Sequence, residues 1–266
     1  MVPVMAGGYV LVAVYVILTN ITEIPSVIGM IVSNAFGLEQ AVGGGIGAAM
    51  MEGIKRGLFS NEAGMGSAAN AAATADVTHP AKQGLIQALG VFVDTLLVCS
   101  ATAFIILLSG AYTTEGVDGI ALTQMALSSH VGAWGSTFLS LVVFLFAFSS
   151  VIGNYYYGET NIEFMKSSKI WLTVYRIAVV GMVMFGSVAK IGIVWDLADL
   201  FMGLMAVLNL IAIALLGKFA FAALKDYVQQ RKDGKNPIFR PDSIQGLPPV
   251  EGWSDVREEK QQEMTL

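Results

Sequence analysis

The sequence has little charge. Asp, Glu, Lys and Arg make up 13% of its 266 residues, about half the roughly 25% found in soluble domains. Hydrophobic residues make up 55%, and the mean hydropathy is +0.66. This balance excludes a soluble globular enzyme, a disordered chain and a nucleic-acid-binding protein. We therefore expect an all-α integral membrane protein that crosses the lipid bilayer several times.

Cysteine and histidine are scarce as well. Cys99 is the single cysteine, so it cannot form an intrachain disulfide. The two histidines, His79 and His130, are too far apart for an HExxH metal pair, and both are expected in loops. Without a Ser/His or metal constellation the sequence indicates no enzyme and no cofactor, which makes an intramembrane hydrolase a weak hypothesis.

Basic residues are missing from the start of the chain, where Lys55 is the first Lys or Arg. An ordinary signal peptide needs a cationic segment before its apolar stretch, so the apolar beginning is not one. A complete polytopic protein and a truncated one both fit this pattern.

Six membrane spans are expected, because each needs about 20 mostly apolar residues. They cover about 3–19, 40–76, 83–109, 133–157, 170–188 and 192–216. A half-apolar segment after the first span indicates an interfacial helix, and a short helix is expected near 119–130. The transmembrane helical region is thus predicted over 1–224, followed by a polar cytoplasmic tail over 225–266 that lacks the apolar content to fold alone.

Loop charges predict the orientation of the spans. Lys and Arg residues follow the second, fourth and sixth spans, whereas the intervening loops carry Glu23, Glu39, Glu115 and Asp118, with Lys190 as an exception. Cytoplasmic loops carry the excess of Lys and Arg. The first span is therefore predicted to begin inside, and the C-terminus to be cytoplasmic.

The span at 40–76 is expected to be broken, because a plain span should not contain Lys55, Arg56, Asn61 and Glu62. A break at about Ser60 to Gly64 would leave free amides that favour an anion and free carbonyls that favour a cation. Short, glycine-interrupted apolar segments point to transporter binding sites. The alternative is an interfacial loop between two ordinary helices.

Asp94 is a second exception, since it lies within the otherwise apolar run at 83–109. A carboxylate inside the membrane indicates a functional site. Asp94 is expected either to form an ion site with Thr95 or to pair with a basic residue elsewhere.

The stretch KRGLFSNEAGMGSAANAAATADVTHPAKQGLIQALGVFVDTLLVC resembles the signature region of the alanine/glycine:cation symporter family, the sodium:alanine symporters. LFAFSSVIGNYYYGE at 145–159 resembles a second block of that family, and the likeness extends from near Met1 to about Tyr227. It implies a partial leucine-transporter-type fold, the second inverted repeat plus one helix of the first. The family's first four core helices have no counterpart, which predicts a truncated transporter that needs them.

The resemblance also implies which residues bind ligands. Substrate binding falls on the unwound segment, at Phe59, Ser60, Asn61, Gly64 and Gly66, with Phe59 limiting the size of the substrate side chain. Sodium binding falls on the 133–157 span, at Phe146, Ser149 and Ser150. There the two hydroxyls would act with the Phe146 carbonyl, since hard oxygen ligands suit a small cation. The alternative is that both hydroxyls bond back to carbonyls of their own helix.

The function implied is sodium-coupled symport of a small neutral amino acid, alanine or glycine, across the plasma membrane of a bacterium or archaeon. Sodium would be the coupling ion, and no nucleic acid would be bound. The alternative is a non-transporting membrane-embedded structural or regulatory subunit, in which the broken helix binds a partner.

Overall fold

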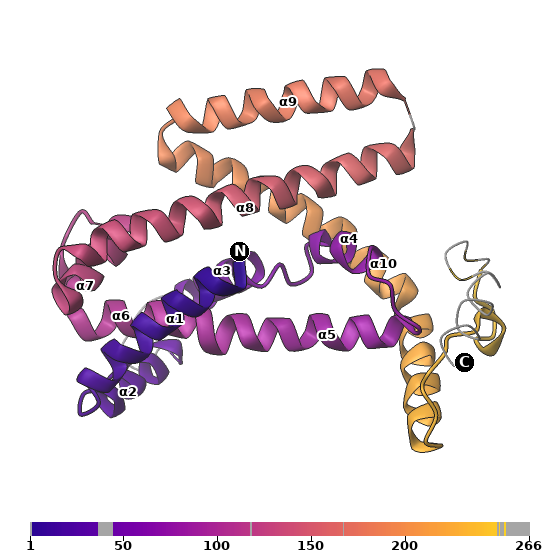
Figure 1. The fold of residues 1–266 in the computed structure, drawn as a ribbon, viewed down its shortest axis with the longest axis horizontal. Coiled ribbons are helices and arrows are strands. Elements are labelled where there is room, and N and C mark those ends of the chain that lie inside the picture. Colours follow the sequence, from indigo (N-terminus) through magenta and orange to yellow (C-terminus); the bar gives the residue numbers. More distant parts are fainter. Residues whose placement is uncertain are drawn as a thin grey trace. The chain divides into compact units, whose positions relative to one another are not determined.

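The computed structural model describes residues 2–36, 45–117, 119–166 and 168–248, together with Val250 and Trp253. Three features of the sequence lie outside this part: Glu39, Asp118 and the end of the tail. The described residues form helices and no strand, which confirms the all-helical class (Figure 1). The α-helices are α1 (Val2–Thr19), α2 (Ile24–Ala35), α3 (Gly45–Ser60), α4 (Ser67–Ala73), α5 (Pro80–Val93), α6 (Ser100–Ser109), α7 (Gly119–Val131), α8 (Trp134–Met165), α9 (Lys169–Val188) and α10 (Ile191–Lys232). A π-helical turn, η1 (Asp94–Cys99), joins α5 to α6, and 3₁₀ turns lie at η2 (Ala111–Thr113) and η3 (Pro241–Ser243).

Four helical segments in the described part of the chain are long and apolar enough to cross a membrane: Pro80–Ser109, Trp134–Met165, Lys169–Val188 and Ile191–Lys232. Each overlaps one of the expected spans. A fifth is obtained if α1 and α2, which are bent by 109° at a short break, count as one span. The structure therefore shows four to five candidate spans where the sequence predicts six.

The expected span at 40–76 accounts for part of this difference. Its described residues form two short helices, α3 with 16 residues and α4 with seven. At a rise of 1.5 Å per residue neither reaches the roughly 30 Å of a bilayer core. Residues 40–44 lie outside the described residues.

The chain divides into two compact units, each of which is described by itself. Unit 1 comprises Met1–Ala63 and Val91–Leu200, and unit 2 comprises Gly64–Gly90 and Phe201–Leu266. The division cuts the broken segment between Ala63 and Gly64, so residues on either side of this bond belong to different units.

The core of unit 1 is formed by α1, α6, α7 and α8, which contact one another (Figure 1). Val16, Ile105 and Leu127 are completely buried there. Polar pairing adds to this apolar packing, because the Tyr9 hydroxyl lies 2.7 Å from the Thr102 hydroxyl. Each hydroxyl thus has a partner within an apolar layer, where an unpaired one would be costly.

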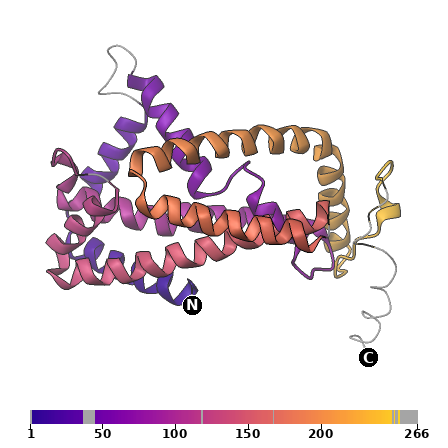
Figure 2. The same cartoon turned by 90° about the horizontal axis from the view of Figure 1, so that it is seen from above.

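A helical hairpin extends from this core. Figure 2 shows α8, which ends at Met165, and α9, which begins at Lys169, running side by side. Gly158 permits the close approach, because a Cβ there would lie 2.0 Å from the Tyr175 hydroxyl. That hydroxyl donates to the Tyr155 carbonyl at 2.9 Å, and Arg176 pairs with Glu159. Small residues at such contacts let membrane helices pack tightly.

In unit 2, the end of α10 differs from the expectation. The span expected over 192–216 continues as helix to Lys232, and apolar residues of the following segment pack against the end of α10. Phe239 and Ile244 pack on Ala223, and the Phe239 amide donates to the Thr78 carbonyl at 2.9 Å. The tail is polar in composition, but these few apolar side chains suffice to anchor its first part.

Candidate functional site

The broken segment lies between α3 and α4. Helix α3 ends at Ser60, the turn covers 61–66, and α4 begins at Ser67. Three residues of the turn have positive φ: Glu62 at 49°, Gly64 at 80° and Gly66 at 90°. Glycine adopts these values without strain, whereas Glu62 is an uncommon non-glycine case. Backbone of this kind concentrates at binding sites, where the surrounding structure compensates for the strain.

In unit 1 the end of α3 meets the π-helical turn η1. The Ser60 hydroxyl donates to the Asp94 carboxylate at 2.8 Å, and the Thr95 hydroxyl donates to the Asn61 side-chain oxygen at 2.9 Å. The structure thus brings two of the expected substrate residues, Ser60 and Asn61, into contact with Asp94 and Thr95, the two members of one expected ion site. The Cys99 thiol joins them, 3.0 Å from the Ser60 hydroxyl and 3.5 Å from the carboxylate.

The π-helical turn explains why Asp94 and Cys99 lie together. A π-helix shifts the backbone bonding from four residues to five, so side chains at i and i+5 come close to the same face. Asp94 and Cys99 are separated by five residues and bracket this turn. Single π-helical turns within α-helices occur frequently at functional sites.

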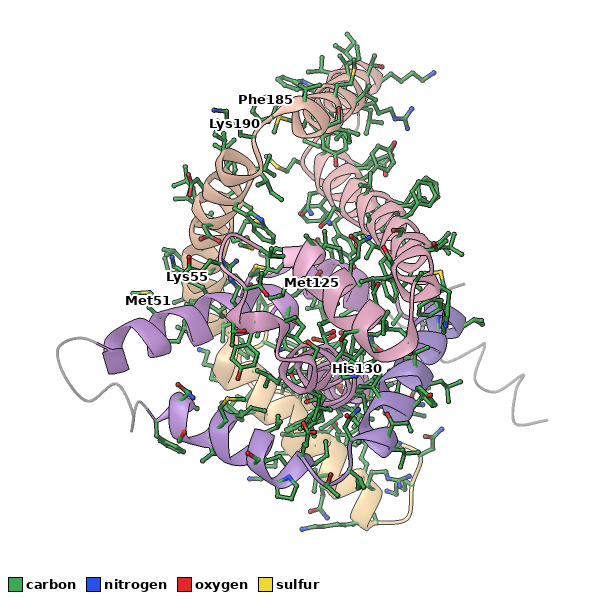
Figure 3. The ribbon with its side chains drawn as sticks, turned by 90° about the vertical axis from the view of Figure 1, so that its left-hand side faces the viewer. Met51, Lys55, Met125, His130, Phe185 and Lys190 are labelled. Carbon is green, nitrogen blue, oxygen red and sulfur yellow. The ribbon has the colours of Figure 1, made fainter. Side chains whose placement is uncertain are left out.

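The other side of the end of α3 packs on the first turns of α10, also within unit 1. The Phe59 ring meets the Trp195 ring edge-on, with centroids 5.6 Å apart, and the Arg56 guanidinium lies 5.2 Å from the centre of the same indole. Lys55, visible on α3 in Figure 3, lies 3.8 Å from the Asp199 carboxylate. Trp195 is not among the predicted site residues, because nothing in its local sequence pattern separates it from an interfacial aromatic residue.

In unit 2, Gly64 and Gly66 contact Asn209 of α10. The Asn209 side-chain amide donates to the Gly64 carbonyl at 2.9 Å. A Cβ added to Gly66 would lie 3.0 Å from the Asn209 Cγ, which is closer than packed atoms normally approach. Asn209 is not among the predicted site residues either. The signal that could have found it is its position, an amide within the apolar run LMAVLNLIAIALL.

The expected sodium ligands lie on α8. The Ser149 hydroxyl donates to the Phe146 carbonyl at 2.9 Å. For Ser149 this is the alternative, a bond back to its own helix, although the same contact also places two candidate ligand oxygens side by side. Ser150 lines a largely apolar cavity of about 520 Å³ between α8 and α9, together with Asn154, whose amide donates to the Ser150 carbonyl at 3.0 Å.

Both histidines are held by contacts with neighbouring residues of the fold. His130 lies in the last turn of α7 (Figure 3), not in the expected loop, and its Nε2 is 3.2 Å from the Ile105 carbonyl oxygen. His79 is completely buried in unit 2, and its ring contacts the rings of Tyr227 and Phe239. These surroundings indicate packing roles for both side chains.

The hydrogen bonds of His79 fix its tautomer. Its Nδ1 accepts the Ala81 amide at 3.1 Å, so the Nε2 that faces the Asp226 carboxylate at 3.3 Å carries the proton. Burial lowers the pKa of His79 below its usual value, and the hydrogen bond and negative charge of Asp226 oppose this only in part. His79 therefore favours the neutral form in the folded protein.

The described part of the chain contains no group of three or more His, Cys, Asp or Glu residues that could hold a metal ion. A metal site built from thiolate and imidazole ligands, or from several carboxylates, therefore has no support there. The oxygen-rich sets around Asp94 and Ser149 instead have the chemistry that hard cations prefer, namely carboxylate, hydroxyl and carbonyl oxygens.

Comparison with known proteins gives consistent matches. The model of the sodium:alanine symporter family matches residues 1–241. The chain is 61% identical to the amino-acid carrier protein AlsT of Bacillus subtilis over 97% of its own length and 55% of that protein. It is 60% identical to the probable sodium/glutamine symporter GlnT of the same organism, over 94% of the chain and 52% of that protein. It is 37% identical to the sodium/alanine symporter AgcS of Methanococcus maripaludis, over 87% of the chain and 51% of that protein. The chain thus spans about half the length of these curated relatives.

Proposed function

Since the chain belongs to the sodium:alanine symporter family, a family of multi-pass membrane transporters, we propose that it contributes to sodium-coupled symport of a small neutral amino acid, alanine or glycine. The observation that carries this proposal is the contact between the broken segment and polar residues of the candidate span Pro80–Ser109, Ser60 with Asp94 and Asn61 with Thr95. A transporter site needs such polar groups within the apolar region.

The end of α3 is suited to positive charge. The last carbonyls of a helix lack partners within the helix and carry its partial negative charge. Asp94 adds a full negative charge next to Ser60, the last residue of α3. Sodium or the ammonium group of an amino acid can exchange its water shell for these oxygens. We assign the ion to Asp94 and Thr95, and the substrate to Phe59, Ser60 and Asn61 with Gly64 and Gly66.

A second sodium site is proposed on α8, formed by the Phe146 carbonyl and the hydroxyls of Ser149 and Ser150. The 2.9 Å separation between the Ser149 hydroxyl and the Phe146 carbonyl allows both oxygens to contact one cation. When the ion binds, the hydroxyl proton turns away and the oxygen lone pair faces the ion.

Substrate size would be limited by Phe59. Its ring is supported edge-on by Trp195, which itself carries the Arg56 guanidinium on one face. A supported aromatic ring leaves less room than a freely rotating one, which favours alanine or glycine over a larger amino acid. The relative GlnT is named for glutamine and AgcS for alanine, so related chains are associated with substrates of different size.

For the fold we propose a leucine-transporter-type half, the second inverted repeat plus one helix of the first. In it α3 and α4 act together as one interrupted span, which corresponds to the sixth core helix of the family's fold. The protein would lie in the bacterial or archaeal plasma membrane, with the chain after α10 in the cytoplasm. The four to five candidate spans, including the bent pair α1–α2, support a multi-pass arrangement.

The test replaces the matching segment of AlsT with this chain, because the two are 61% identical over 258 residues. The swapped transporter is reconstituted in liposomes, and uptake of labelled alanine, glycine and glutamine is measured with an inward sodium gradient and with potassium in its place. We expect sodium-dependent uptake of alanine or glycine at several times the rate of glutamine. Uptake that is equal in sodium and potassium, while AlsT itself remains sodium-dependent, contradicts the proposal.

A further inference from the structure

Asn209 is a polar residue in the apolar part of α10, and the proposed function does not yet use it. It lies in the run LMAVLNLIAIALL, within the candidate span Ile191–Lys232. A polar side chain in such a run is costly unless it has a hydrogen-bond partner. Its partner is not a side chain but the main-chain carbonyl of Gly64, at 2.9 Å.

The Gly64 carbonyl oxygen cannot be satisfied by a regular helical hydrogen bond. It belongs to the turn between α3 and α4, where φ is 80° at Gly64 and the backbone is not helical. In a membrane-embedded segment a carbonyl without a partner is strongly unfavourable, because no water replaces the missing hydrogen bond. Asn209 and Gly64 therefore satisfy each other.

Gly66 gives a second and independent sign of the same contact. Its φ is 90°, and an added Cβ would lie 3.0 Å from Cγ, 3.1 Å from Oδ1 and 3.3 Å from Cβ of Asn209. Both the backbone angle and the tight space disfavour a side chain there. Asn209 thus contacts the turn at two points, through a hydrogen bond at Gly64 and a van der Waals contact at Gly66.

We infer that Asn209 is a positioning residue for the substrate segment: by holding the Gly64 carbonyl, it fixes the orientation of the peptide between Gly64 and Met65. A trans peptide is planar, so its carbonyl and its N–H point in opposite directions. The Met65 N–H is thereby directed away from α10, as a donor for the substrate carboxylate. This role rests on the proposed function, in which the turn binds the amino acid.

The direct test uses Asn209→Leu in the swapped transporter, since leucine has a similar size and no donor. The KM for the amino acid should rise about five- to tenfold, the change that one hydrogen bond of ordinary strength carries. The maximal rate and the half-saturating sodium concentration should change less than twofold. Asn209→Gln, which keeps the amide, should recover part of the loss. Gly203→Ala is the matched control on α10, because an added Cβ there meets no atom within 4 Å.

A second measurement does not depend on transport. Hydrogen–deuterium exchange of a peptide covering 61–67 in the purified full chain should become faster in Asn209→Leu and stay unchanged in Gly203→Ala. Gly66→Ala should impair uptake on its own. In the double variant with Asn209→Ala, the loss of uptake should be smaller than the sum of the losses in the two single variants. The reason is that alanine lacks the Cγ and Oδ1 atoms of Asn209, which the added Cβ would otherwise meet.

The outcomes separate this inference from the proposed function. If Asn209→Leu lowers the maximal rate and the melting temperature together and leaves the KM unchanged, the residue is only structural and the inference is wrong. If exchange at 61–67 is the same in Asn209→Leu and the unaltered chain, the inference is also wrong. If the unaltered swapped transporter shows no sodium dependence, the proposed function fails, while the exchange experiment still decides whether Asn209 holds the turn.

Discussion

Single side chains in the two proposed ion sites differ in the charge that they bring. Asp94 supplies a carboxylate beside the end of α3 and accepts the Ser60 hydroxyl at 2.8 Å. Ser149 supplies a neutral hydroxyl that is already close to a carbonyl of its own helix. An ion gains more from a full opposite charge than from a dipole in an apolar region. The two sites should therefore respond differently to substitution.

Asp94→Asn should raise the half-saturating sodium concentration by about tenfold, equal to about 1.4 kcal/mol. Asparagine keeps an oxygen that can accept the Ser60 hydroxyl, so the change removes the charge and preserves the shape. Sodium-dependent uptake in the swapped transporter measures the effect. Glu115→Gln is the control, since Glu115 is an exposed loop residue. A sodium dependence that is the same in Asp94→Asn and the control would exclude Asp94 as an ion ligand.

Ser149→Ala should weaken sodium activation by about five- to tenfold, because a neutral oxygen ligand is lost. Its control is Ser187→Ala on α9, where the hydroxyl donates to the Met184 carbonyl at 2.7 Å, also three residues earlier. Both variants lose a back-bonded hydroxyl, but only the first loses a proposed ligand. Equal sodium activation curves for the two variants would show that Ser149 only bonds to its own helix.

At the scale of elements, α10 contributes to both units: its first turns contact α3 in unit 1, and its later turns contact other residues of unit 2. Its first turns pack on α3 in unit 1 through Trp195 and Asp199. Its later turns, in unit 2, bind the turn at Gly64 and then hold the segment that follows. Near its end, Gln230 accepts the Ile238 amide at 2.9 Å and donates to the Ile238 carbonyl at 3.0 Å. The buried His79 lies beside this end of the helix, against Asp226.

The stability of unit 2 should fall as the pH is lowered through the titration of His79. Its folded pKa is lowered by burial, so the unfolded chain binds the proton first, near the usual value of about 6.5. The contribution of His79 to stability is therefore complete above about pH 6.5 and is lost as the pH falls through the folded pKa. Thermal unfolding in detergent between pH 8 and pH 5 measures the loss.

His79→Gln is the comparison for this experiment, because glutamine can still donate to Asp226 and does not titrate. The variant should melt lower at pH 8 and show a flatter dependence on pH. A slope between pH 8 and pH 5 that matches that of the unaltered chain would mean that other groups cause the loss.

At the scale of the molecule, the described residues show a multi-pass helical chain whose candidate spans are largely exposed. Within an apolar 18-residue stretch of each candidate span, the share of residues buried in the chain is 17% for Pro80–Ser109 and Trp134–Met165 and 0% for Lys169–Val188 and Ile191–Lys232. In a membrane the driving force for burial is absent because lipid is as apolar as the side chains. Such helices are held by the bilayer as well as by each other.

Loop charges predict how these helices are oriented. In a Cys99→Ala background, a cysteine placed at Glu115 should react with a membrane-impermeant thiol reagent in intact cells. A cysteine placed at Lys235 should react only after the cells are permeabilised, because basic loops lie in the cytoplasm. Labelling is measured on the swapped transporter by gel shift. Reaction of Lys235→Cys in intact cells would reverse the predicted orientation.

Local sequence was enough to establish the class of protein and the most unusual segment. A low content of charge and long apolar runs require helices in a membrane, because every backbone polar group there must be satisfied within the chain. The charged and glycine-rich residues between Lys55 and Gly66 predicted a break at about Ser60 to Gly64, and the helix does end at Ser60. The residues that resemble the symporter family lie in the same stretch.

The partners of that segment were decided only by the tertiary structure. Nothing in the sequence brings Ser60 to Asp94, which is 34 residues away, or Gly64 to Asn209, which is 145 residues away. The same holds for His79 and Asp226, which are 147 residues apart. Periodicity and composition describe a helix and its exposure to lipid, whereas the pairing of polar groups depends on which helices meet and at what height. In an apolar surrounding each such group must find a partner, and the fold determines which one it finds.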